Sequence, residues 1–213
     1  GHGDLGRLAK LFDFSTRLFL HLHLREQDAG RIGKRAKEEA YYFPAGVAPG
    51  PHPETFFGVH PSVVRGGRQR ELLLPHLVRW NDDLVLRHSR AYQCAPGDGF
   101  HLPAGILHAP GSVLTLELQE PSDVAAVWQA RVDGHAIPKA MLHRDLPPEE
   151  WNARGEEAAF DQVDWEACAD PFFYENHHTP PLPVAGSVQP GGFQEWIHYN
   201  SRRFSGKRLV VNP

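Results

Sequence analysis

Residues 17–24 read Arg-Leu-Phe-Leu-His-Leu-His-Leu, and this alternation constrains the fold more than any other segment. Successive side chains of a β-strand point to opposite faces, so the run places its leucines on one face and Phe19, His21 and His23 on the other. Both rings of the His-x-His pair therefore point to the same side. We expect a strand with an apolar face and a second face that can bind a ligand.

Other short runs also predict strands, separated by turns rich in glycine and proline. The chain has 20 glycines and 19 prolines among 213 residues, which favours many short strands over a helical bundle. Within one run, Val113, Thr115 and Glu117 share a face, and within another Pro75 indicates an edge strand, a bulge or a helix start. Strands of this length and spacing predict a sandwich or barrel, and we expect them at residues 40–43, 55–59, 71–80, 83–88, 113–118 and 124–132.

The two ends of the chain differ from this β-rich part. Residues 4–12 predict a short helix that Asp4 caps. After residue 137 the pattern changes, because a Pro-Pro-Glu-Glu sequence at 147–150 predicts a helix with proline in its first turn, and 164–169 predicts another. A proline-rich arm follows at 171–192, and strands resume at 193–199 and 203–211. We therefore divide the chain into residues 1–136, 137–192 and 193–213.

Composition excludes several classes of protein. Lys and Arg number 22 against 26 Asp and Glu, a formal charge of −4, which is unlike a general nucleic-acid binder. No apolar run is long enough to span a membrane, and no secretory signal opens the chain. Cys94 and Cys168 are the only cysteines, which excludes a disulfide framework and fits a reducing cytoplasm. We expect a cytoplasmic protein that binds a small molecule, with its oligomeric state left open.

A second motif, Pro-Ala-Gly-Ile-Leu-His at 103–108, presents His108 directly after a tight turn. Most of the 14 histidines are expected to be surface residues. Two imidazoles on one strand face, a third from another strand and a carboxylate can bind Zn, Fe, Mn, Ni or Co. A His-x-His pair followed by Pro-x-Gly-x-x-His in a β-rich chain is the pattern of the cupin double-stranded β-helix. We therefore expect an all-β cupin fold.

Over residues 10–128 the chain resembles the type I phosphomannose isomerases, a cupin group, in the order of its motifs. The matching residues are Lys10, His21-Leu-His23, Lys37-Glu-Glu39, Ala104-Gly-Ile-Leu-His108-Ala109 and the Glu-Leu-Gln-Glu-Pro-Ser-Asp run at 117–123. The resemblance implies a cupin jelly roll over 1–136, a helical insertion with a proline-rich arm over 137–192, and the start of a second, truncated jelly roll over 193–213.

The resemblance also implies functional roles. It implies a metal-dependent aldose–ketose isomerase of a sugar or sugar phosphate, with zinc as the favoured metal. The implied metal ligands are His21, His23, Glu39 and His108, and His21 stands where the family has glutamine. The implied catalytic charges are Lys10, Lys37 and Glu117.

The carboxylate ligand has alternatives. Glu54, in His-Pro-Glu at 52–54, mimics a Lys-Pro-Glu version of the carboxylate motif. Glu39 is preferred because the Ala-Tyr-Tyr sequence after it keeps the family's order. A third interpretation uses the usual cupin acid just after the His-x-His pair, for which Glu26, Gln27 and Asp28 are the candidates.

Two departures from the family affect its phosphate. Val127 stands where the family has a catalytic arginine, with Arg131 nearby, and Phe19 stands where it has a phosphate-binding serine. A phenyl ring cannot donate a hydrogen bond to phosphate. These changes predict altered or lost phosphate recognition. They also keep open a non-catalytic sugar-binding cupin and a different metal cupin enzyme such as an iron dioxygenase.

Overall fold

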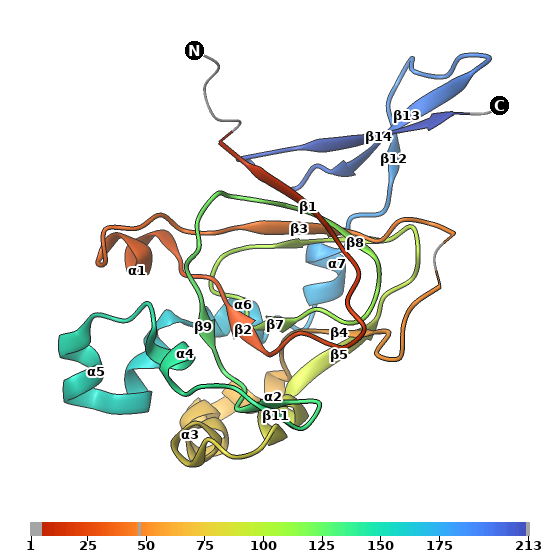
Figure 1. The fold of residues 1–213 in the computed structure, drawn as a ribbon. Helices are drawn as coiled ribbons and strands as arrows, with labels where there is room; N and C mark the ends of the chain where they lie inside the picture. The colour runs from red at the N-terminus through yellow and green to blue at the C-terminus, as the bar shows by residue number, and fades with distance from the viewer. Residues whose placement is uncertain (1–5, 47, 212–213) are drawn as a thin grey trace.

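The computed structural model describes residues 6–46 and 48–211, and two antiparallel sheets form its body (Figure 1). In strand order, the first sheet contains β1 (Leu8–Phe12), β8 (Thr115–Gln119), β3 (Glu39–Tyr42) and β6 (Gly99–Leu102). The second contains β5 (Ser89–Gln93), β4 (Glu54–Val59), β7 (His108–Ala109), β2 (His21–Leu22) and β9 (Ala126–Val127). Apart from β4 and β5, consecutive strands from β1 to β9 therefore lie in different sheets.

Aromatic side chains pack between the two sheets. Phe57 of β4 lies 4.8 Å from Phe100 of β6 and 6.4 Å from Tyr41 of β3, measured between ring centroids. All three side chains are almost completely buried. Leu20, Leu22 and Leu24 are also fully buried, as the alternation of residues 17–24 predicts. This core packs the inner faces of the two sheets against each other.

The predicted helix at residues 4–12 is wrong within the described part of the chain, and Asp4 lies outside it. Residues 8–12 form β1, which pairs with β8 so that Lys10 faces Glu117. A helix as short as the predicted one has little stability of its own, so pairing with β8 decides the conformation of residues 8–12. Leu8 and Leu11 are 43% and 66% exposed, so the apolar residues that would have formed one face of the predicted helix are not buried.

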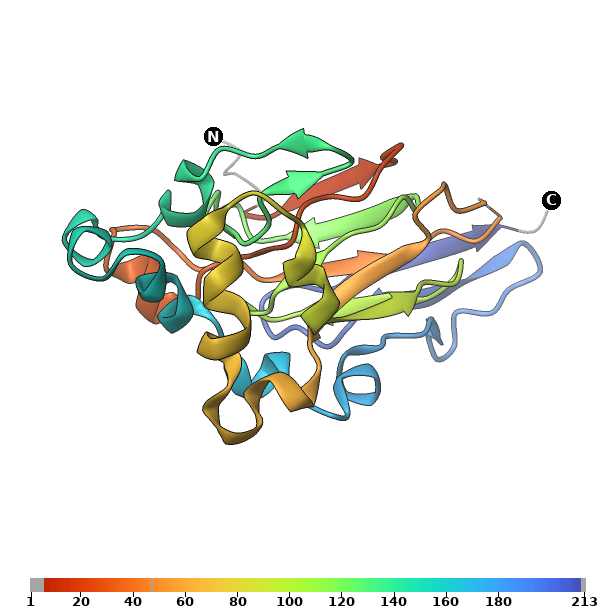
Figure 2. The ribbon, with the colours of Figure 1, turned by 90° about the horizontal axis from the view of Figure 1, so that it is seen from below.

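The predicted strands at 71–80 and 83–88 are also wrong. Residues 69–79 form the helix α3 (Gln69–Arg79), which contains Pro75, and residues 84–88 form the 3-10 helix η2 (Leu84–His88). Leu73 and Leu77 are four residues apart and buried, which is helical spacing. Helices α2 (Pro61–Val64) and η1 (Arg65–Gly67) precede them, and α1 (Glu26–Gly30) follows β2. Figure 2 shows α3 crossing one end of the sheets.

The segment after β9 is mostly helical. The hairpin β10 (Arg131–Val132) and β11 (His135–Ala136) leads into α4 (Ala140–His143), α5 (Pro148–Arg154), η3 (Gly155–Gln162), α6 (Trp165–Cys168) and α7 (Phe173–His177). Buried Phe160 packs on Trp128, with ring centroids 5.1 Å apart. The structure is thus mostly β-sheet with helices added, and the division into three domains remains a prediction.

A third sheet of β12 (Leu182–Pro183), β13 (Gly192–His198) and β14 (Gly206–Val211) projects from the body at the upper right of Figure 1. The Arg208 guanidinium lies 5.4 Å above the Tyr42 ring, and Arg203 Nη1 donates to Glu120 Oε1 over 2.8 Å. These contacts attach the third sheet to β3 and to the end of β8. Among the described residues, none of the helices is long and apolar enough to cross a membrane.

Candidate functional site

The three histidines singled out in the sequence lie together on the second sheet. His21 of β2 and His108 of β7 face each other in the sheet register, and their ring centroids are 4.2 Å apart. His23 lies just beyond β2, with its ring 5.0 Å from that of His21. One nitrogen of each ring can be chosen so that all three lie within 4.8 Å of one another. The His-x-His pair therefore presents both rings to one side, as predicted.

Backbone carbonyls orient each of these rings. His21 Nδ1 lies 2.9 Å from Phe19 O, His108 Nδ1 lies 2.8 Å from Ile106 O, and His23 Nδ1 lies 2.7 Å from Val124 O. A carbonyl oxygen only accepts, so each Nδ1 carries the proton and donates it. Each Nε2 then keeps a free lone pair, which is the arrangement of histidines that bind a metal.

Glu39 approaches the histidines from the opposite sheet. Its Oε1 lies 2.9 Å from His23 Nε2, and its Oε2 lies 3.4 Å from His108 Nε2. Both of these Nε2 atoms are buried and make no hydrogen bond of acceptable geometry within the described residues. Converging nitrogen lone pairs beside a buried carboxylate match the ligands of a borderline divalent metal. The four residues therefore fit such an ion by their chemistry.

Burial and charge act differently on the two kinds of group. Burial lowers the pKa of His21 well below its ordinary value, and His108 and His23 lower it further. Burial also lowers the pKa of His23. Burial alone would raise the pKa of Glu39, but His23, His108 and Lys37 outweigh it and hold that pKa well below its ordinary value. These shifts favour neutral imidazoles at His21 and His23 next to an ionised Glu39.

Lys37 and Tyr41 hold the Glu39 carboxylate from its own sheet. Lys37 Nζ lies 2.8 Å from Glu39 Oε1, and the Tyr41 hydroxyl donates to Glu39 Oε2 over 2.8 Å. Burial and the neighbouring Glu39 raise the pKa of Tyr41 well above its ordinary value. Tyr41 thus remains a neutral donor. Sequence reasoning missed this role, although Tyr41 lies two residues after Glu39 and therefore shares a face of β3 with it.

Glu117 and Lys10 lie beside Glu39 and Lys37 and add two charged side chains from the first sheet. Glu117 faces Tyr41 in the β3–β8 register and Lys10 in the β1–β8 register. Lys10 Nζ lies 3.5 Å from Glu117 Oε1, which is buried and makes no hydrogen bond within the described part of the chain. Burial and the nearby Glu39 raise the pKa of Glu117 to about 7, against the opposing effect of Lys10 and Lys37.

The alternative carboxylates lie in other contacts. Glu54 pairs with Arg17 over 2.7 Å, Asp28 with Arg25 over 2.9 Å, and Glu26 with Arg203 over 3.6 Å. Gln27 is an exposed residue of α1. Position therefore favours Glu39 over the other acidic residues considered from the sequence.

The two residues that depart from the family pattern lie beside His21. The Phe19 ring lies 5.4 Å from the His21 ring. Val127 of β9 is fully buried and faces His21 in the register. Arg131, the nearest arginine in sequence, is exposed and donates to Gly134 O within its own hairpin. On this side the site is apolar.

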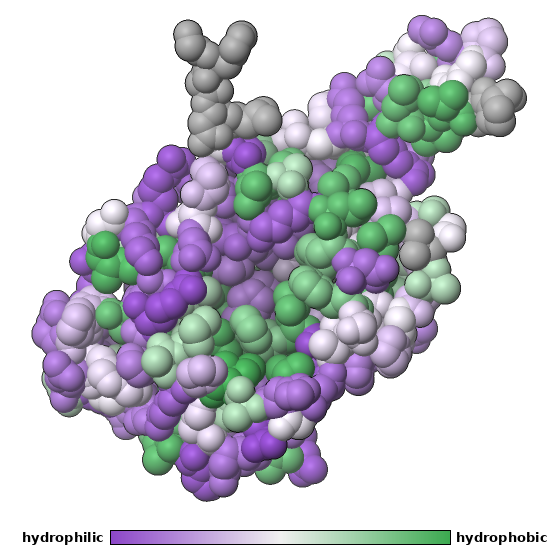
Figure 3. Space-filling view, viewed as in Figure 1, coloured by the Kyte–Doolittle hydropathy of each residue, from purple (hydrophilic) through white to green (hydrophobic). Residues whose placement is uncertain are grey.

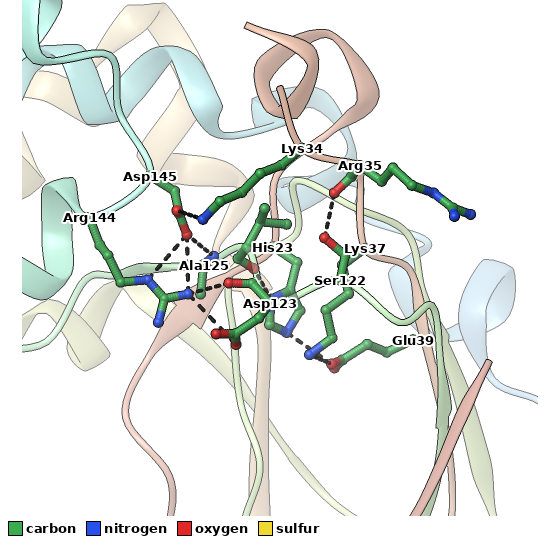
Figure 4. Close-up of polar contacts among 11 residues, drawn as sticks. His23, Lys34, Arg35, Lys37, Glu39, Ser122, Asp123, Ala125, Arg144 and Asp145 are labelled. Atoms are coloured by element: carbon green, nitrogen blue, oxygen red, sulfur yellow. Dashed lines mark hydrogen bonds and ion pairs between the residues drawn. The ribbon is translucent and has the colours of Figure 1, made fainter. Parts of the chain in front are cut away.

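A loop that precedes β9 fixes the orientation of His23. Asp145, which is 3% exposed, accepts from Ala125 N over 2.8 Å and lies 2.5 Å from Lys34 Nζ. Figure 4 shows Asp145 between these groups and Arg144. The adjacent Val124 carbonyl is the acceptor for His23. Sequence reasoning missed Asp145, because 20 residues separate it from Ala125 and no local motif marks the contact.

Two facing sheets with converging histidines and a carboxylate define a β-sheet protein with a candidate metal centre. No family model matches this sequence, and no curated protein matches it. Among solved structures, the mannose 6-phosphate isomerase from Bacillus subtilis is similar, with a TM-score of 0.66 and 19% sequence identity over 97% of this chain. A variant of phosphomannose isomerase from Salmonella typhimurium has a TM-score of 0.60 and 11% identity over 96% of this chain.

These similarities confirm the resemblance to mannose-6-phosphate isomerases at the level of the fold. The chain spans 56% of the length of the Bacillus protein and 63% of the Salmonella protein.

Proposed function

We propose that this protein is a metal-dependent aldose–ketose isomerase acting on a monosaccharide or a monosaccharide derivative. The observation that carries the proposal is that metal-binding side chains and acid–base side chains lie together in one site. Converging histidines and Glu39 would hold the metal, and Glu117, Lys10 and Lys37 lie beside them in positions suited to acid–base work. The fold shared with mannose-6-phosphate isomerases supports this assignment.

Aldose–ketose isomerisation moves a proton between neighbouring carbons through an enediol, while a second proton moves between their oxygens. A divalent metal in such a site supplies positive charge that stabilises the developing oxyanion. His21, His23, His108 and Glu39 would hold that metal. We assign zinc as the favoured ion because imidazole nitrogens with one carboxylate suit it.

Glu117 is the proposed acid–base group. Its buried Oε1 makes no hydrogen bond in the described structure, so it can take the proton from the carbon next to the carbonyl and return it to the neighbouring carbon. Lys10 Nζ lies close enough to stabilise the carboxylate when it is ionised. Lys37, fixed on Glu39, offers its remaining N–H groups to the sugar oxygens.

Recognition of a phosphate differs from that of the family. Phe19 and Val127 are apolar and adjoin His21, so neither can donate to a phosphate there. The proposed enzyme therefore either binds a sugar that lacks this phosphate or holds the phosphate elsewhere.

Proton exchange with solvent tests the proposal directly. The zinc-loaded protein is incubated in D2O with mannose, fructose and their 6-phosphates, and NMR follows deuterium incorporation next to the carbonyl together with aldose–ketose conversion. We expect both in at least one aldose–ketose pair. Tight sugar binding with neither deuterium exchange nor aldose–ketose conversion in any pair would contradict the proposal.

That outcome would instead favour a non-catalytic sugar-binding cupin. One specific observation supports this second candidate, because buried Val127 takes the position in which the family has an arginine. An iron dioxygenase remains the third candidate, and the identity of the bound metal tests it. The cytoplasmic location and a small-molecule partner also remain predictions.

A further inference from the structure

The connection between β1 and β2 runs along one side of the candidate site. It leaves the first sheet after Phe12 and crosses to the second sheet, where β2 begins (Figure 1). Three phenylalanines lie along it, Phe12, Phe14 and Phe19, and each is partly exposed. The phenylalanines of the core between the sheets differ, since Phe57 and Phe100 are almost completely buried. The rings of this connection are therefore accessible to a ligand.

Ring contacts join the two ends of the connection through the site itself. Between ring centroids, Phe12 lies 6.2 Å from Tyr41, and Tyr41 lies 6.3 Å from His108. His108 lies 4.2 Å from His21, which in turn lies 5.4 Å from Phe19. Figure 3 shows a hollow at the centre of this face, with hydrophilic residues along its upper side and hydrophobic residues to its right and below. The site thus has a polar side and an aromatic side.

The cationic side chains nearest the aromatic side are already paired. Lys10 shares a face of β1 with Phe12, and its Nζ lies 3.5 Å from Glu117 Oε1. Lys37 Nζ lies 2.8 Å from Glu39 Oε1. An anionic group on a substrate would have to compete with these carboxylates for the ammonium groups, and a phenyl ring offers it no donor. The hydroxyls of an uncharged sugar both donate and accept, so they can join these pairs without breaking them.

The connection is anchored by contacts on its far side. Leu18 N donates to Pro110 O over 2.9 Å, and Arg17 Nη1 donates to Glu54 Oε1 over 2.7 Å. The Arg17 guanidinium also lies 5.0 Å from the centroid of the Phe56 ring. These contacts hold the aromatic side in position before a ligand binds, which reduces the entropic cost of binding.

We propose that the substrate is an uncharged monosaccharide, and that the end of its carbon chain remote from the carbonyl packs against Phe12 and Phe19. The methyl group of a 6-deoxyhexose suits these rings best, because a hydroxyl in the same place would be buried without a hydrogen-bond partner. The hydroxyls along the rest of the chain face Lys37 and Glu117. The inference rests on the proposed isomerase function for the end of the sugar that reacts.

Binding of alditols to the zinc-loaded protein tests the inference without catalysis, because an alditol has no carbonyl to isomerise. Titration calorimetry compares 6-deoxymannitol, mannitol and mannitol 6-phosphate. We expect 6-deoxymannitol to bind most tightly, and mannitol 6-phosphate to bind roughly tenfold or more weakly than mannitol. Tightest binding of mannitol 6-phosphate, or no measurable binding of the two uncharged alditols, would overturn the proposal.

Phe19→Ala and Phe12→Ala test whether the rings contact the sugar. Each should weaken binding of 6-deoxymannitol roughly tenfold or more, because an apolar contact is lost. Phe19→Leu should keep most of the affinity, since an apolar side chain remains. Phe172→Ala is the matched control, because Phe172 is a 63% exposed phenylalanine next to α7. Affinities equal to wild type in both Phe19→Ala and Phe12→Ala would overturn the proposal.

Zinc content of the same preparations separates contact with the sugar from support of a metal ligand. The Phe19 ring contacts His21, whereas the Phe12 ring contacts Tyr41. Weaker binding in both variants with zinc retained would support the proposal. Loss of zinc together with affinity in Phe19→Ala, and wild-type affinity in Phe12→Ala, would show that the Phe19 ring supports His21 and would overturn the proposal.

Turnover of the matching sugars distinguishes this inference from the proposed function. In Phe12→Ala we expect KM for 6-deoxymannose to rise roughly tenfold with kcat little changed. The highest kcat/KM with mannose 6-phosphate would overturn the inference and support the isomerase. Binding of uncharged alditols that depends on Phe12 and Phe19, without isomerisation of any sugar, would support the inference and contradict the isomerase.

Discussion

The two sheets that face each other across the candidate site hold their functional groups in different ways. On the second sheet, His21, His23 and His108 each use Nδ1 to donate to a backbone carbonyl. On the first sheet, side chains hold one another, since Lys37 and Tyr41 contact Glu39. The histidine side is therefore oriented by the main chain, and the carboxylate side by a network of side chains.

This difference has consequences for substitution. A backbone carbonyl cannot be mutated away, so the histidine side is disturbed only by loss of a histidine or by a shift of the strand or loop that carries a carbonyl. Every contact on the carboxylate side can be removed by a single change of side chain. The histidine side of the site should therefore tolerate changes in its surroundings better than the carboxylate side tolerates changes around Glu39 and Glu117.

The largest effect is expected from His108→Ala. This substitution removes a buried ligand nitrogen, and the remaining histidines cannot complete a four-ligand site. We expect the wild-type protein, purified without a histidine tag, to contain about one divalent ion per chain. Elemental analysis should show its loss in His108→Ala and its retention in His135→Ala, which changes an exposed histidine of β11. Equal metal content in all three proteins would show that the histidines do not bind metal.

Glu117→Gln should impair the acid–base group on the first sheet and leave the histidines of the second sheet in place. The amide cannot exchange a proton at carbon, so kcat should fall by about 10²- to 10⁴-fold. Metal content should stay at the wild-type level, because the structure places His21, His23, His108 and Glu39 together without Glu117. Metal content and turnover are measured on the same preparation, and loss of both together would show that Glu117 also supports the metal ligands.

Asp145→Ala tests whether the main chain orients His23. Without this carboxylate, Ala125 N loses its acceptor and the Val124 carbonyl that binds His23 is free to shift. A group that orients a metal ligand typically affects affinity by roughly 10- to 100-fold, and we expect the lower end of that range. Asp123→Ala is the control, because it removes the exposed carboxylate that Arg144 also contacts. Competition with a chromophoric chelator measures the affinity, and equal effects of the two variants would exclude a special role for Asp145.

Tyr41→Phe should have the smallest effect. It removes one hydrogen bond to Glu39 and keeps the ring in the core, so the free energy of unfolding should fall by about 1 kcal/mol. The pKa of Glu39 should rise, because the charged carboxylate loses a donor. Metal binding should then weaken mainly towards acidic pH. Urea unfolding and metal titration at several pH values measure the two effects, and a variant identical to wild type in both would show that Tyr41 does not help to hold Glu39.

Two features of the fold could not be predicted from local sequence. Residues 8–12 form a strand only because β8 lies alongside them, and Pro75 lies inside a helix although residues 71–80 resemble a strand. The sequence preferred Glu39 over Glu54 through the order of the family's motifs, not through any local pattern. Both residues lie in strands, and only the order of the strands in the two sheets places Glu39 opposite His23.

The spacing of the histidines already placed their rings on one face, because the two-residue period of a strand is a local property of the backbone. Glycine and proline content likewise indicated a fold of short strands. Lys10 and Glu117 come together only through the pairing of β1 with β8. Local patterns record the direction of a side chain along its own strand, whereas contact between groups from distant strands depends on sheet order, which the packing of the whole core determines.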